Sequence, residues 1–164
     1  MKRILLLSLL WLTAVSALAH KDRRLSLAAD GSVPELPPAY AATRIQIEFS
    51  EGGTGQLTKL TFTSAGRQTV VKSCVLQLVD ASSRDRVALA GSWYHDKRLL
   101  PDYVHILFKA STIQASLPED PGVLFLFSLT DARLLEVQEI VPLPEEQAVQ
   151  YRKVTLKSGC PSRQ

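Results

Sequence analysis

Three histidines are the side chains of this sequence best suited to hold a metal ion. They are His20, His95 and His105. Imidazole nitrogen is a good ligand for Cu(II), and this ion favours a square-planar set of nitrogen and oxygen donors. A histidine at a free N-terminus would offer two donors, its α-amino group and its Nδ1, and a second imidazole would add a third. The aspartates that could add an oxygen ligand are Asp30, Asp96 and Asp102.

A second group of chemistry-bearing residues lies between Gly91 and Tyr103. This segment holds Trp93, Tyr94 and Arg98, and it ends in Tyr103. Aromatic rings and arginine are enriched at the centres of protein interfaces. A protruding loop of this composition predicts a protein inhibitor or immunity protein that neutralises an envelope-active toxin or hydrolase. The alternative is that Trp93 folds back over one end of the domain, because tryptophan is usually largely buried.

The sequence contains no recognisable catalytic motif. It has no GxSxG nucleophile elbow, no HExxH zinc helix and no glycine-rich phosphate loop. Function has to be argued from a site, and no set of residues here forms a catalytic one by its spacing. We therefore expect a binding protein and not an enzyme.

The first nineteen residues have the three parts of a cleavable signal peptide. Lys2 and Arg3 are basic, Ile4 to Val15 is apolar, and small residues precede position 20 in Ala17-Leu18-Ala19. Cleavage after Ala19 would leave His20 as the first residue, in a periplasmic or secreted protein. Removing two of the 19 basic residues leaves 17 against 16 acidic ones, a net charge of +1. This balance excludes a strongly basic nucleic-acid face, and no second apolar stretch predicts a membrane span.

Cys74 and Cys160 are the two cysteines of the chain. In an oxidising compartment they are expected to form one structural disulfide. A redox role is the weaker reading because the pair has no CxxC spacing. The bridge would tie the C-terminal tail to a central strand and, closing about 85 residues, would contribute about 4 to 5 kcal/mol.

Most of the chain alternates apolar and polar residues with a period of two. Ile45, Ile47 and Phe49 share one face of the first such segment. The expected strands are 43–50, 57–63, 69–79, 86–90, 103–110, 122–129, 133–141 and 148–157. Segment 122–129 is nearly all apolar, which is typical of a central strand covered on both faces. Segment 132–140 also fits a short helix, but the strand is preferred.

This pattern predicts an all-β fold, an immunoglobulin-like antiparallel β-sandwich of seven to eight strands with one disulfide. The expected organisation is a signal peptide over 1–19, an extended proline-containing leader over 20–42, and the sandwich domain over 43–164. Pro34, Pro37 and Pro38 give the leader its composition.

The start of the expected mature chain resembles CopC-like periplasmic copper-resistance proteins. The resemblance rests on His20, Ala29-Asp30-Gly31, the strand ending in Phe49-Ser50-Glu51, and segment 57–63 with Gly66. It covers roughly the first fifty residues after the signal. It implies an immunoglobulin-like fold and a Cu(II) ligand at His20. The later Asp-Gly-His segment of that family has no counterpart here, so His95 and His105 are unmatched candidates for the second imidazole.

Overall fold

The computed structural model describes residues 22–52, 55–93, 101–110, 121–143, 145 and 148–162. Strands dominate it, as the period-two pattern predicts. The strands are β1 (Arg23–Leu25), β2 (Arg44–Phe49), β3 (Leu57–Ser64), β4 (Arg67–Val70), β5 (Val87–Ser92), β6 (Tyr103–Lys109), β7 (Gly122–Ser128), β8 (Leu134–Leu143), β9 (Ala148–Lys153), β10 (Leu156–Lys157) and β11 (Cys160–Pro161). The helices are η1 (Pro38–Tyr40), α1 (Ser73–Leu76) and η2 (Ala81–Ser83).

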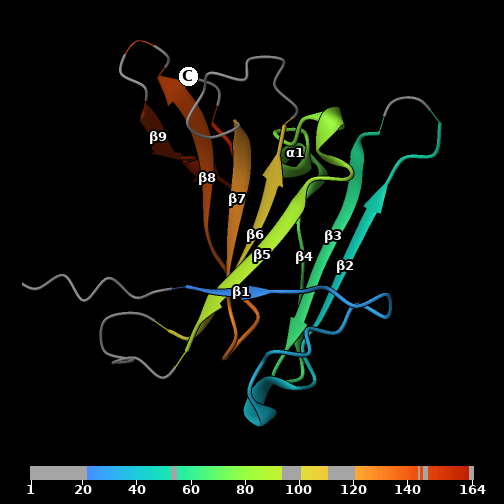
Figure 1. Ribbon diagram of the computed structural model, residues 1–164. Helices are drawn as coiled ribbons and strands as arrows, with labels where there is room; N and C mark the ends of the chain where they lie inside the picture. Colours follow the sequence, from blue (N-terminus) through green and yellow to red (C-terminus); the bar gives the residue numbers. More distant parts are fainter. Residues whose placement is uncertain are drawn as a thin grey trace, which may run out of the picture.

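The strands form two main antiparallel sheets, confirming the predicted sandwich. One sheet has the order β1-β5-β6-β7-β8-β9 and the other β2-β3-β4 (Figure 1). Within each sheet the strands after β1 are joined to their sequence neighbours, so both sheets are meanders. Along the chain, β1 comes first and belongs to the six-stranded sheet, β2 to β4 form the three-stranded sheet, and β5 then pairs with β1.

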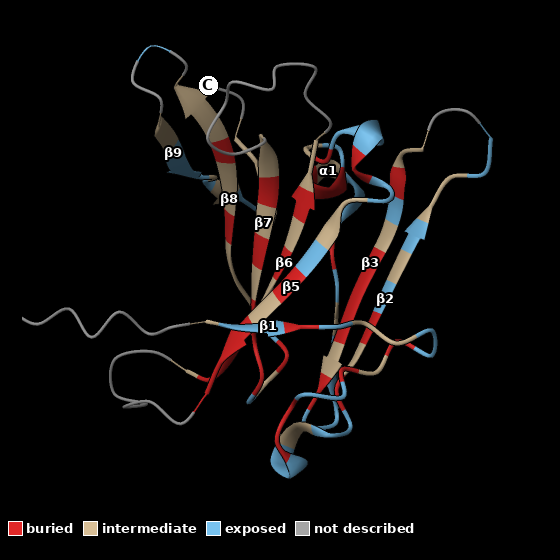
Figure 2. Ribbon diagram, viewed as in Figure 1, coloured by how far each residue is buried: buried red, intermediate tan, exposed pale blue. Residues whose placement is uncertain are grey.

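The hydrophobic core lies between the facing sides of these sheets. Successive strand residues point to opposite faces, and buried positions alternate along β6 and β7 (Figure 2). Phe62 from β3 stacks on Phe127 from β7, with ring centroids 4.7 Å apart. Phe108 and Phe125 meet edge to face at 5.6 Å on neighbouring strands. The first pair joins the two layers, and the second lies within the six-stranded sheet.

The strand expected over 69–79 is wrong beyond Val70. Strand β4 ends at Val70, and the chain then forms the single helical turn α1. Val71, Val75 and Val79 are all buried. Val71 still pairs with β3 through its amide and the Leu60 carbonyl, whereas Val75 and Val79 have the four-residue spacing of one side of a helical turn. The apolar run therefore packs against the core as a turn at one end of the sandwich.

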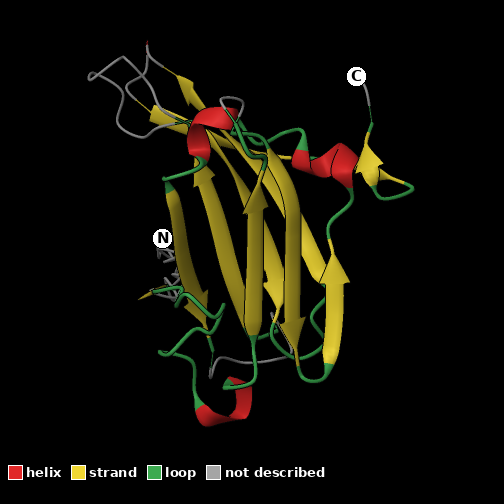
Figure 3. Ribbon diagram, turned by 90° about the vertical axis from the view of Figure 1, so that its right-hand side faces the viewer, coloured by secondary structure: helices red, strands yellow, loops and turns green. Residues whose placement is uncertain are grey.

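The disulfide between Cys74 and Cys160 is present, with the two Cα atoms 5.6 Å apart. Because Cys74 lies in α1, the bridge ties the C-terminal hairpin to this helix, and the expected link to a central strand is wrong. The segment expected as one strand over 148–157 is divided into β9 and β10. Strand β10 pairs with β11, and this hairpin lies beside α1 (Figure 3).

The described part of the expected leader, residues 22–42, contributes to the sheet. Arg23, Arg24 and Leu25 pair with Gly91, Ala90 and Leu89 of β5. Three residues are too few to show a period in the sequence, which explains why β1 was not expected. Among the described residues, no helix has the length and apolar character needed to cross a membrane.

Candidate functional site

The outer face of the six-stranded sheet carries the side chains that the core does not use. On β6, Val104, Ile106 and Phe108 point inward and are fully buried. His105 and Leu107 therefore point outward. The register places Leu126 opposite His105 and Leu124 opposite Leu107. An aliphatic surface thus begins next to the one histidine that the structure describes.

His105 lies against the start of the described chain. Its Nδ1 is 3.2 Å from Oδ2 of Asp22. The hydroxyl of Tyr103 donates a 2.9 Å hydrogen bond to Oδ1 of the same carboxylate. The rings of Tyr103 and His105 are stacked, with centroids 4.9 Å apart and planes 19° apart. Asp22 therefore connects the N-terminal segment to two outward side chains of β6.

Burial and charge have opposite effects on His105. Desolvation lowers the pKa of the imidazole, and the Asp22 carboxylate partly opposes this by favouring the charged form. The net direction is downward, which favours the neutral imidazole. Burial and the neighbouring Asp22 raise the pKa of Tyr103 to about 12, so its hydroxyl keeps its proton and acts as a donor. The group is thus a neutral imidazole and a neutral phenol around one carboxylate.

A hollow of about 510 Å³ opens on this outer face. Ala88, Leu107, Leu124 and Leu126 contribute to its aliphatic floor. Its polar side chains are Asp22, Arg24, His105, Glu136, Gln138 and Tyr151. The prediction that segment 122–129 is covered on both faces is therefore corrected. Its inner face is core, while its outward leucines are half-buried and line the hollow.

The predicted interface residues are only partly described. Trp93 is buried at 8% exposure, and the Arg23 guanidinium lies 5.2 Å from its ring centroid. Tyr103 is also buried, at 7%. These two rings belong to the body of the domain and do not protrude as anchors. Tyr94 and Arg98 lie outside the described residues.

The predicted metal ligands are also divided. His105 is on the outer face, whereas His20, His95 and Asp96 lie outside the described residues. The two other candidate aspartates, Asp30 and Asp102, form hydrogen bonds with other side chains and with the backbone. Asp30 accepts hydrogen bonds from the amide and hydroxyl of Ser32, and the buried Asp102 accepts one from Tyr40. The part of the chain that the structure describes holds no group of three metal-ligating side chains.

Sequence reasoning missed Asp22 and Arg24. Neither stands in a motif, and only the register between β1 and β5 brings them to the outer face. The nearest signal is the position of Asp22, two residues after His20.

The chain was compared with protein-family models, curated proteins and solved structures, and none of them matches it. The residues and their geometry therefore carry the functional argument.

Proposed function

We propose that this protein is an exported, non-catalytic binding protein that holds one Cu(II) ion between a mature N-terminal His20 and the imidazole of His105. The observation that carries the proposal is the 3.2 Å contact between His105 Nδ1 and Asp22 Oδ2. Metal-binding histidines commonly direct the other ring N–H at a carboxylate, which fixes the tautomer. Asp22 would keep the proton on Nδ1 and leave the lone pair of Nε2 for the metal.

Covalent geometry supports the choice of His105 as partner of His20. His20 is two residues from Asp22 in the sequence, and two residues of extended chain span at most about 7 Å. Asp22 is itself in contact with His105. A chelate at a mature N-terminal His20 would therefore have His105 as the described imidazole nearest to it along this path. The lowered pKa of His105 also suits a ligand, because a protonated imidazole has no lone pair for a metal.

The donor set fits Cu(II) in type and number. The amino nitrogen and Nδ1 of His20 would form one chelate ring, and Nε2 of His105 would provide a third nitrogen in the square plane. Water would fill the fourth position. Such a site takes up and delivers a metal ion and needs no catalytic residue. A protein inhibitor acting through the Trp93 segment is less well supported, because the two described rings of that segment are buried.

The proposal is tested by Cu(II) titration of protein exported through its own signal. Wild-type protein is expected to bind one equivalent. His105→Gln should weaken binding by more than 100-fold, and Asp22→Asn by about 10- to 100-fold through loss of the orienting carboxylate. His95→Gln is the matched control and should bind as wild type does. Equal affinity in His105→Gln and wild type would overturn the proposal.

One additional alanine placed before His20 provides a second test. It leaves every side chain in place but removes the amino nitrogen of His20 from the chelate. We expect this variant to lose the tight site. An unchanged Cu(II) affinity in this variant would show that the amino group of His20 is not a ligand, whatever the result for His105→Gln.

A further inference from the structure

The hollow on the outer face has the form of a ligand site that adjoins the proposed metal site, with Asp22 and His105 in its lining. Its volume of about 510 Å³ lies in the range of small-molecule sites, which are mostly apolar with a few placed polar groups. Its aliphatic floor runs from Ala88 on β5 across Leu107 and Leu124 on the next two strands. Strands are spaced by about 4.8 Å, so the face from β1 to β9 measures about 24 Å across five intervals. The floor is aliphatic along its middle, and polar side chains from β1, β8 and β9 lie at its sides.

The charged side chains around the hollow differ in whether they have hydrogen-bond or ion-pair partners. The Glu136 carboxylate accepts hydrogen bonds from Lys153, at 2.8 Å, and from Gln138. The Asp22 carboxylate accepts from Tyr103 and faces His105. The Arg24 guanidinium, which also lines the hollow, has no ion-pair or hydrogen-bond partner among the described residues. Its positive charge is the one that a ligand could neutralise.

We propose that the hollow binds a free aliphatic carboxylate, with the carboxylate on Arg24 and the alkyl chain along the floor formed by β5, β6 and β7. A guanidinium forms paired, charge-assisted hydrogen bonds with a carboxylate. The aliphatic floor removes methylene groups from water without offering them a polar partner. An alkylammonium ion would be repelled by the positive charge of Arg24. An uncharged alcohol could not form the paired hydrogen bonds with the guanidinium.

A smaller hollow of about 420 Å³ shares Arg24, Ala88 and Leu89 with the first. It is lined by Leu25, Leu27 and Val87, beyond the end of the three-residue pairing between β1 and β5. The longer floor lies in the first hollow, and we place the chain there. Leu124 allows this choice to be tested, because its half-buried side chain lines the first hollow and not the second.

The test is a titration of the metal-free protein with octanoate and decanoate below their micelle concentrations. Each buried methylene is worth about 0.8 kcal/mol, so decanoate should bind up to about 15-fold more tightly than octanoate. Arg24→Gln should weaken decanoate binding about tenfold or more. Arg133→Gln, at an exposed turn, is the matched control and should leave it unchanged. Decan-1-ol should bind wild type no better than decanoate binds Arg24→Gln.

A filling variant tests the position of the chain. Leu124→Trp fills the first hollow from its floor and leaves the second unchanged, and we expect it to abolish decanoate binding. Gln68→Trp adds the same ring at an exposed position of β4 and should bind as wild type does. Unchanged binding in Leu124→Trp, equal binding of decanol, or binding to anionic vesicles without binding of monomeric decanoate would each overturn the proposal. The metal plays no part in this experiment, so its outcome is independent of the copper titration.

Discussion

Replacing both cysteines by serine should lower the free energy of unfolding by about 4 to 5 kcal/mol. The bridge joins residues 86 positions apart. In the chain-entropy account, closing a loop of that length removes about 15 cal/mol/K from the unfolded state, or about 4.6 kcal/mol at 25 °C. This is a large share of the 5–15 kcal/mol that stabilises a typical domain. The double variant Cys74→Ser/Cys160→Ser is expected to be only marginally folded.

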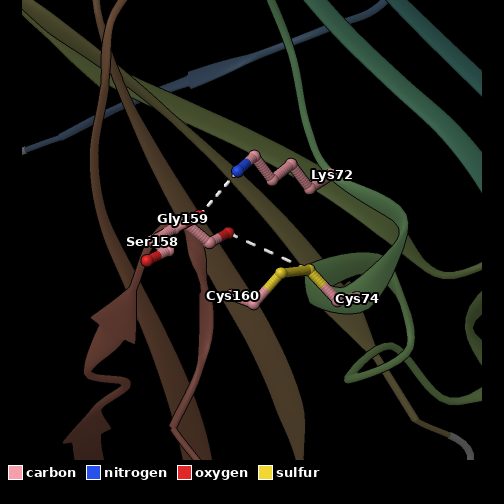
Figure 4. The surroundings of a disulfide bond; sticks show 5 residues. All are labelled: Lys72, Cys74, Ser158, Gly159 and Cys160. Atoms are coloured by element: carbon pink, nitrogen blue, oxygen red, sulfur yellow. Dashed lines mark hydrogen bonds between the residues drawn. A yellow bond between two sulfur atoms is a disulfide. The ribbon is translucent and has the colours of Figure 1, made fainter.

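The structure indicates that this loss lowers the unfolding free energy of the whole domain and not only that of the C-terminal hairpin. The segment that leads to the C-terminal hairpin is held by a hydrogen bond from the Val154 amide to the Val137 carbonyl, and Leu156 packs against the core. Lys72, just before α1, donates a 2.6 Å hydrogen bond to the Ser158 carbonyl beside the bridge (Figure 4). The hairpin therefore has contacts of its own, so the bridge is expected to act mainly by restricting the unfolded chain.

Urea unfolding followed by circular dichroism measures the effect. We expect a lower midpoint and a steeper dependence on urea, because the unbridged unfolded chain exposes more surface. Lys72→Met is the control: it removes the exposed hydrogen bond but keeps the bridge, and it should cost less than about 1 kcal/mol. A loss below about 1 kcal/mol in the double serine variant would refute the reasoning. It would mean that the hairpin detaches freely and that the bridge restricts little of the unfolded domain.

Other positions give smaller, separate tests by the same unfolding assay. Phe62→Ala should cost about 3 to 5 kcal/mol, because its ring is fully buried between the sheets; a loss below 1 kcal/mol would contradict the packing described. Gly31→Ala should cost about 2 kcal/mol or more, since φ is +80° and a Cβ would lie 2.6 Å from the Ile45 carbonyl oxygen. Gly66→Ala, at φ +72° with open space around the added Cβ, should cost clearly less, and equal losses would count against the role given to the contact. The lysine partner on β9 lowers the pKa of Glu136, so this carboxylate stabilises the fold above its unfolded pKa and loses that contribution as pH falls through its lower folded pKa. Glu136→Gln should therefore flatten the acid side of the stability profile by less than about 1 kcal/mol, and an unchanged profile would show that the pair contributes nothing.

The alternating segments of the sequence predicted most of the strands. Ile45 and Ile47, or Val104 and Ile106, reveal a strand because each buries every second side chain against the other sheet. The turn α1 escaped this reasoning because four residues are too few to outweigh the β-branched run before it. The four-residue spacing of Val75 and Val79 was the available signal.

The site could be predicted only in part, for a different reason. His105 was a candidate from residue type alone, but its contact with Asp22 depends on the order of β1, β5 and β6 in the sheet. That order joins segments about 80 residues apart, which no local pattern contains. The outward Leu124 and Leu126 were visible in the sequence as an unusually apolar strand. Apolar residues on both faces indicated a covered strand, whereas the structure places a hollow over one of them.

The most direct test of the copper proposal combines intact mass with Cu(II) titration on one preparation of natively exported protein. The mass determines the N-terminus, and the titration determines the number and affinity of sites. We predict a chain that begins at His20 and binds one Cu(II) tightly, with release of protons. A chain that begins elsewhere, or binding no stronger than that of an ordinary exposed histidine, would contradict the proposal.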